Sequence, residues 1–117
     1  MLRHLSTCLF LILPAAGLGE EAHQETAWVP MSGDEIRVAL TGRALEYKSA
    51  HQDFRASGRT RYVAGRESWG YWRVEGDQYC SMWPPSSLWA CYGMAQRGET
   101  LRFIGEAGDT TDGVYSD

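Results

Sequence analysis

The feature that most constrains this chain is the stretch WGYWRVEGDQYCSMWPPSSLWACY, from Trp69 to Tyr92. It contains four of the five tryptophans and two of the three cysteines, Cys80 and Cys91. Its pattern predicts three short strands, Gly70 to Glu75, Gln78 to Trp83 and Leu88 to Ala95, joined by a Gly-Asp turn and a Pro-Pro-Ser-Ser loop. Aromatic and β-branched residues on both sides of such a turn are typical of a β-hairpin.

Residues 1–19 have the features of a secretory signal peptide. Arg3 and His4 form a short positive region, Leu5 to Leu13 is apolar, and Pro14 to Gly19 supplies small residues for a peptidase. The apolar run is too short for a permanent membrane span, which needs about 20 residues. Cys8 lies inside this run rather than after it, so we do not expect a lipoprotein. The sequence predicts a cleaved signal peptide and a periplasmic or secreted protein.

Cleavage leaves an even number of cysteines. The predicted strands place Cys80 and Cys91 on neighbouring antiparallel strands, where the geometry allows a bridge, and an oxidising compartment favours it. Closing this loop stabilises a fold by about 3 kcal/mol in the chain-entropy model. The alternatives are two free thiols or a metal site, but two cysteines lack the further ligands that zinc requires.

The mature chain has room for one small domain, which we place at residues 31–105 after a flexible leader at residues 20–30. Ser32 and Glu35 fit a capping box, and Gly42 is a natural helix stop, so a helix is expected from Gly33 to Thr41.

Beyond this helix, turn signals recur about every ten residues. We expect further strands at Ala44 to Phe54, Thr60 to Ala64 and Thr100 to Gly105. The predicted fold is mainly β: a small antiparallel meander or barrel-like sheet with one short N-terminal helix. Residues 106–117 are expected to form an acidic polar tail, with at most a short edge strand at Val114 and Tyr115.

Several of these motifs, taken in order, resemble a group of small, uncharacterised secreted bacterial proteins. The matching segments are MSGDEI at residues 31–36, LTG at 40–42, GYWRVEGDQYC at 70–80, Cys91, and RGETLRF at 97–103. The resemblance implies a periplasmic β-rich domain with one disulfide. It implies no activity, because none is established for the group.

No catalytic motif is present: the chain has neither a G-x-S-x-G elbow nor an H-E-x-x-H pair. His51 and Asp53 fall on the same face of a strand, a pattern compatible with an acid-base or metal pair. An exposed polar strand edge is the alternative that we favour. The aspartates of the tail miss the spacing of a calcium loop. We therefore predict a protein that is not an enzyme and has no cofactor or metal.

Four arginines lie close together in the sequence although the chain is acidic. After cleavage, ten basic residues face fifteen acidic ones. The candidate basic patch consists of Arg55, Arg59, Arg61 and Arg66. Such a patch suits a polyanion or the acidic surface of a partner, whereas secretion and net charge argue against nucleic acid. The alternative is the solvent face of a hairpin.

Aromatic side chains fall on both faces of the central strands. Alternation places Trp72 with Val74 on one face, and Trp69 with Tyr71 on the other. One face must be the core, so rings on the other form a candidate apolar binding surface. Its residues are Trp83, Pro84, Pro85, Trp89, Tyr71 and Arg73. The alternative is that a small domain needs these rings to fill its core.

These observations favour a non-catalytic extracytoplasmic binding or accessory protein, with a periplasmic or extracellular protein as partner. One alternative is a secreted hydrolase inhibitor that presents the loop from Pro84 to Trp89. A second is a small-ligand carrier of the mini-lipocalin type. A third is an enzyme that uses His51.

Overall fold

The computed structural model describes residues 27–117. The predicted signal peptide and most of the predicted leader lie outside the described residues. The elements are β1 (Val29–Pro30), α2 (Gly33–Leu40), β2 (Arg43–Glu46), β3 (His51–Phe54), β4 (Arg59–Ala64), β5 (Arg66–Glu75), β6 (Gln78–Met82), β7 (Ala90–Arg97), β8 (Thr100–Ile104) and β9 (Thr110–Tyr115). Within this part of the chain, no helix is long and apolar enough to cross a membrane.

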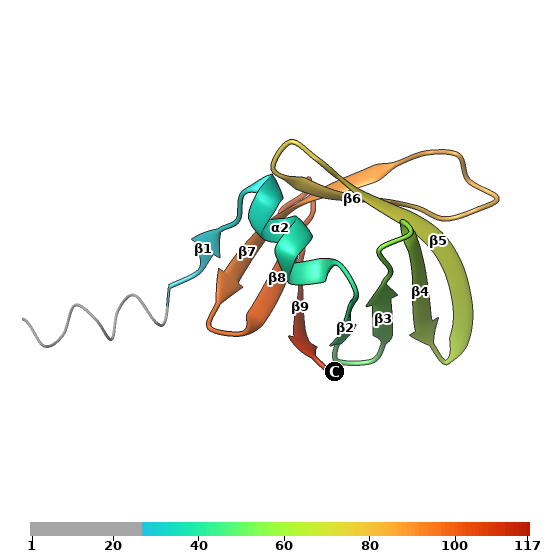
Figure 1. The fold of residues 1–117 in the computed structure, drawn as a ribbon, viewed down its shortest axis with the longest axis horizontal. Helices are drawn as coiled ribbons and strands as arrows, with labels where there is room; N and C mark the ends of the chain where they lie inside the picture. Colours follow the sequence, from blue (N-terminus) through green and yellow to red (C-terminus); the bar gives the residue numbers. More distant parts are fainter. Residues whose placement is uncertain (1–26) are drawn as a thin grey trace, which may run out of the picture.

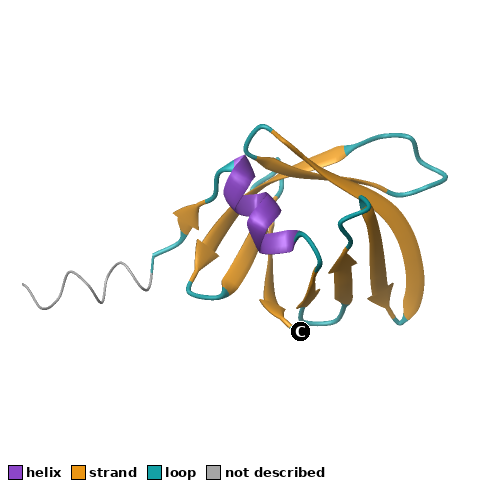
Figure 2. Cartoon of the chain, viewed as in Figure 1, coloured by secondary structure: helices purple, strands orange, loops and turns teal. Residues whose placement is uncertain are grey.

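Strands β2 to β9 form a closed antiparallel meander barrel of eight strands (Figure 1). Each strand pairs with the next along the chain, and β9 returns to β2 through the pair Leu45 and Tyr115. β1 pairs with β7 through Val29 and Gln96. The predicted mainly β fold with one short helix is confirmed, and closure leaves the barrel strands without a free edge (Figure 2).

The helix α2 begins at the predicted capping box. The Glu35 backbone N–H donates to Ser32 Oγ at 3.2 Å, and the Ser32 N–H donates to Glu35 Oε1 at 3.0 Å. The helix ends at Leu40, and Thr41 is its C-cap. Ile36 and Leu40 are fully buried. α2 contacts β2 on one side of the barrel and β5 and β6 on the other, so it lies across one end.

The first residue of α2 touches the β5–β6 turn. The Gly33 N–H donates to Asp77 Oδ1 at 2.8 Å. A side chain at Gly33 would overlap the carbonyl oxygen of Gly76. Two segments distant in the sequence, Ser-Gly-Asp-Glu and Gly-Asp, therefore meet at this contact and seat the helix on the barrel.

The core lies beneath α2. Phe54 stacks edge-on against Trp72 with ring centroids 5.7 Å apart, and Leu45 and Leu101 are fully buried beside them. The Trp72 indole N–H donates to the Arg55 carbonyl oxygen at 2.9 Å, so this large ring is buried with its polar atom satisfied. The strand alternation predicted for Trp72 against Trp69 is confirmed, and the Trp72 face is the core.

Several sequence predictions of element boundaries are wrong. β5 begins at Arg66 and not at Gly70, and β7 runs from Ala90 to Arg97 and not from Leu88 to Ala95. The segment from Ala44 to Phe54 is a hairpin and not one strand, because the Tyr47 N–H donates to the Ala50 carbonyl at 2.8 Å and turns the chain. The acidic tail contains β9, which pairs with both β2 and β8. Its sequence hides the strand because its buried inward position is Gly113, while Val114 faces solvent.

Cys80 and Cys91 form the predicted disulfide. They face each other directly across β6 and β7, with an S–S distance of 2.02 Å. Cys80 is fully buried, and the Glu75 carboxylate lies 3.4 Å from its sulfur. The bridge fixes the register of these strands next to the exposed loop that joins them.

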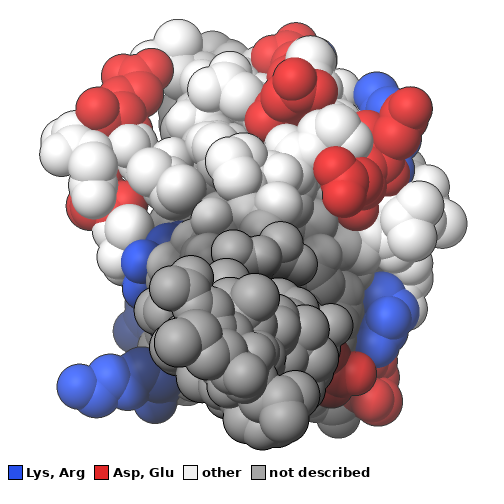
Figure 3. Space-filling view, turned by 90° about the vertical axis from the view of Figure 1, so that its left-hand side faces the viewer, with Lys and Arg blue, Asp and Glu red and all other residues white. Residues whose placement is uncertain are grey.

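Charged side chains of both signs occupy the surface. On the face shown in Figure 3, acidic groups lie mainly over the upper part and also at the lower right, and basic groups lie at both sides.

The contact between Gly33 and the β5–β6 turn gives the first testable prediction. We expect Gly33→Ala to lower the free energy of unfolding by about 1–3 kcal/mol, because the added methyl group must displace the Gly76 carbonyl. Helix propensity alone would make alanine more stable than glycine here, so a loss of stability must come from the contact with Gly76. Gly93→Ala is the matched control, since a Cβ there meets nothing within 4 Å. Urea denaturation of both variants measures the difference, and equal stabilities would refute this account.

Candidate functional site

The barrel is hollow at the end away from α2. Inward side chains that continue past the core enclose a cavity of about 610 Å³. Its lining includes four tyrosines, Tyr47, Tyr62, Tyr79 and Tyr92, with Phe103 and Trp83. Small polar side chains, Ser68, Ser81 and Thr111, complete much of the remaining wall. The barrel therefore has a filled half beneath the helix and an open half lined by rings and hydroxyls.

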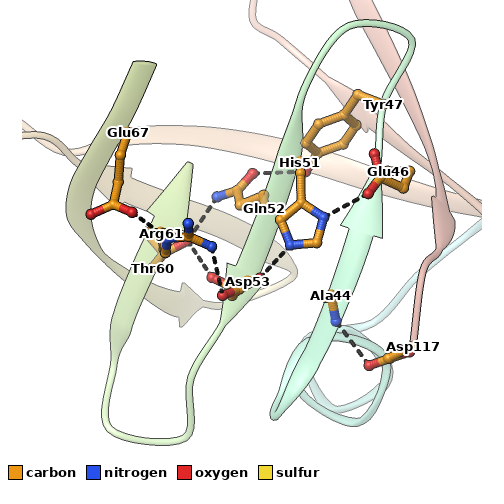
Figure 4. Close-up of polar contacts among 10 residues, drawn as sticks. All are labelled: Ala44, Glu46, Tyr47, His51, Gln52, Asp53, Thr60, Arg61, Glu67 and Asp117. Atoms are coloured by element: carbon orange, nitrogen blue, oxygen red, sulfur yellow. Dashed lines mark hydrogen bonds and ion pairs between the residues drawn. The ribbon is translucent and has the colours of Figure 1, made fainter. Parts of the chain in front are cut away.

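A hydrogen-bond network around Gln52 forms the floor of the cavity. The Tyr47 hydroxyl donates to Gln52 Oε1 at 2.7 Å. Gln52 Nε2 donates to Thr60 Oγ1 at 2.9 Å and to the Tyr79 hydroxyl oxygen at 3.1 Å. Figure 4 shows Gln52 between Tyr47 and Thr60. Because both ends of the buried amide are satisfied, the floor is rigid and its polar groups are already oriented.

The cavity lining is almost free of charge. Burial raises the pKa of Tyr79 to about 12 and raises the pKa of Tyr47 well above its ordinary value. Both phenols therefore keep their protons at physiological pH. The lining has no lysine, arginine or histidine, and its one carboxylate is Asp109 in the exposed β8–β9 turn. The cavity presents neutral hydrogen-bonding groups and ring faces.

Trp83 closes part of the mouth. Its indole N–H donates to Ser81 Oγ at 3.2 Å, and its ring packs edge-on against Tyr62 with centroids 5.9 Å apart. Gly70 makes room for it, because a Cβ there would lie 2.6 Å from the Trp83 ring. The ring is thus held against β5 by packing on two sides.

The predicted aromatic surface is divided between two places. Trp83 and Pro84 line the cavity. Tyr71, Arg73 and Trp89 lie outside the barrel, where the Arg73 guanidinium is 3.8 Å from the centroid of the Trp89 ring. Pro85 is exposed in the loop between them. The structure does not gather these six residues into one surface, and their role in binding stays a prediction.

The predicted basic patch is also divided. Arg55 and Arg59 stack near Trp69, with 4.7 and 5.2 Å from guanidinium carbon to ring centroid. Arg61 instead donates to Glu67 Oε2 at 2.7 Å. Arg66 is exposed at the start of β5. The patch reduces to two arginines, Arg55 and Arg59, beside an indole ring.

His51 and Asp53 lie on the same outer face of β3, as predicted, but in a charge network. His51 Nδ1 lies 2.7 Å from Glu46 Oε1, and Nε2 lies 2.6 Å from Asp53 Oδ1 (Figure 4). The hydrogen bond to Glu46, helped by Asp53, raises the pKa of His51. With both ring nitrogens donating, the imidazolium clamps β2 to β3. In this protonated form neither nitrogen has a lone pair with which to accept a proton or bind a metal, so either role would require deprotonation of the ring.

Comparisons with protein-family models, curated proteins and solved structures find no significant match. Four of the cavity residues that sequence analysis missed are Tyr47, directly after β2, and Gln52, Tyr62 and Tyr92 on β3, β4 and β7. Strand alternation groups Tyr79, Ser81 and Trp83 on one face, and that grouping was the available signal.

The His51 clamp predicts a pH dependence. The folded pKa of His51 is raised above its unfolded value of about 6.5, so the clamp stabilises fully below that pH. The contribution is lost as pH rises through the folded pKa. We expect it to be less than about 1 kcal/mol, because the groups are partly exposed.

The measurement is the NMR titration of the imidazole protons, assigned with His51→Gln. The stability advantage of the wild type over this variant should shrink as the imidazole deprotonates. A His51 pKa at or below the unfolded value would contradict the clamp.

Proposed function

We propose that this protein is a non-catalytic periplasmic or secreted binding protein that holds a small ring-bearing ligand in its barrel cavity. The observation that carries the proposal is the cavity of about 610 Å³, walled by aromatic rings over a satisfied polar floor. Cavities of about 300–1,000 Å³ suit small organic molecules. The Cys80–Cys91 disulfide supports an oxidising compartment.

The lining selects the charge of the ligand. An anion entering the cavity would lose its hydration without meeting a lysine or arginine among the lining residues. A neutral or cationic ring can stack on the tyrosine faces and hydrogen-bond to the floor. The carboxylate of Asp109 near the mouth further favours a cation. The expected ligand is a flat neutral or cationic molecule.

A second candidate function is inhibition of a hydrolase through the loop between β6 and β7. Residues 84–88 of this loop are all exposed, and Leu88 is 79% exposed. An exposed apolar side chain on a disulfide-flanked loop is a suitable inserting element. Of these loop residues only Pro84 also lines the cavity, so residues 85–88 form a surface separate from the ring-lined interior.

We predict that blocking the cavity abolishes ligand binding. Thr111 and Val114 lie on the same strand, but Thr111 lines the cavity and Val114 is exposed outside it. Thr111→Trp should fill the cavity and remove binding, whereas Val114→Trp adds the same ring outside and should leave affinity unchanged. The probes are benzyl alcohol, benzyltrimethylammonium and benzoate, followed by shifts of the ¹⁵N amide signals of Tyr79 and Ser81.

Benzyl alcohol, which is neutral, and benzyltrimethylammonium, which is a cation, should bind the wild type. Benzoate, an anion, should bind at least about tenfold more weakly. Equal binding to both tryptophan variants would place the ligand elsewhere and overturn the proposal. Tighter binding of benzoate would overturn the charge selection.

A further inference from the structure

We propose a second binding site on the outside of the barrel, for a doubly charged oxyanion such as a phosphate or sulfate group. The site is a hollow of about 270 Å³ lined by Arg55, Ser57, Arg59 and Trp69. It lies where the β3–β4 turn meets the outward face of β5. This proposal rests on two arginines that do not line the cavity, and Trp69 is the one residue that lines both hollows. It stands whether or not the cavity binds a ligand.

The turn that carries the two arginines is held rigidly. The Arg55 N–H donates to the Arg59 carbonyl at 2.9 Å, and the Gly58 N–H donates to the Arg55 carbonyl at 3.0 Å. Trp72 anchors the same turn to the core through its indole N–H to the Arg55 carbonyl and its backbone N–H to the Gly58 carbonyl, both at 2.9 Å. The backbone of the site is therefore preorganised.

Aromatic faces hold the guanidinium groups over this turn. The Arg59 guanidinium carbon lies 5.2 Å from the Trp69 ring centroid and 5.0 Å from that of Tyr71. Arg55 lies 4.7 Å from the Trp69 ring. Stacking uses the face of a guanidinium and leaves N–H donors at its edge. The Arg59 Nε–H already donates to the Gly70 carbonyl at 3.4 Å, so the terminal NH2 groups of Arg59 are the donors left for an anion. Paired guanidinium donors have the fork geometry that binds two oxygens of an anion.

Neither arginine is neutralised within the described part of the chain. The ion pairs found among residues 27–117 involve other arginines and not Arg55 or Arg59. The nearby Glu67 is matched by Arg61 at 2.7 Å. Two positive charges therefore stay uncompensated in an otherwise acidic protein.

The remaining lining groups also suit an anion. Ser57 Oγ accepts the Arg59 N–H at 3.3 Å, which leaves its hydroxyl proton to donate. The Trp69 indole N–H is already used by Glu67 Oε1 at 2.8 Å, so this residue contributes its ring. The lining offers hydrogen-bond donors and no carboxylate. A hollow of this size accepts one phosphate or sulfate group rather than a length of polymer.

The test is a titration of the full oxidised protein with inorganic phosphate at pH 8 and with sodium sulfate, against sodium chloride at equal ionic strength. The readouts are the NMR signals of the arginine Nε–H groups and of the Trp69 indole N–H. Saturating shifts with phosphate or sulfate and not with chloride are expected, and the stronger of the two arms identifies the oxyanion. Shifts that follow ionic strength alone would overturn the site.

Matched variants distinguish binding in this hollow from a general attraction of anions to positive charge. Arg55→Gln should weaken binding at least about fivefold, and Arg59→Lys should also weaken it, because lysine keeps the charge but loses the fork. Arg66→Gln removes the same charge at an exposed position outside the hollow and should change affinity less than about twofold. Equal weakening in Arg55→Gln and Arg66→Gln, or full affinity in Arg59→Lys, would overturn the proposal.

Discussion

Gly33, the first residue of α2, lies so close to the β5–β6 turn that any side chain on it would overlap the Gly76 carbonyl. The Asp77 carboxylate accepts the Gly33 N–H in the same contact. A barrel of eight strands has two open ends, and an apolar core at one end must be shielded from water. This contact places α2 so that Ile36 and Leu40 cover that core. The position of the core, and hence of the hollow half, follows from it.

The opposite end stays hollow because its inward side chains do not fill the interior of the barrel. Ser68, Ser81 and Thr111 are too small to reach across the barrel, and four of the large side chains there are tyrosines, whose hydroxyl groups need polar partners. Glycine further limits the filling: Gly70 accommodates the Trp83 ring, which lies along the wall. Rings therefore line the space instead of filling it. A cavity at the mouth is the physical result of this choice of residues.

How far the sequence predicts this arrangement depends on how local each signal is. Ser32 with Glu35, the Gly76-Asp77 turn and the pairing of Cys80 with Cys91 depend on neighbouring residues, and the structure bears them out. Closure by β9 was missed because the strand places Gly113 inward and a valine outward, so no apolar alternation marks it. The cavity depends on which strands lie opposite one another, and that is set only when the barrel closes. The basic patch divided for a similar reason, since Arg61 finds Glu67 across a strand pair.

Strand alternation in the closed barrel places neutral side chains in the cavity and charged side chains outside it. On β5, Ser68 faces the cavity, while the ring of its neighbour Trp69 borders the cavity and also packs against Arg55 and Arg59 outside. On β3, Gln52 sits in the neutral floor while His51 and Asp53 on either side join the ionic network. A one-residue register shift in either strand would bring charges into the cavity and expose the polar floor. The helix contact at the β5–β6 turn and the ion pairs on β2 to β5 oppose such a shift, so interactions that stabilise the fold also keep the two candidate sites distinct in charge.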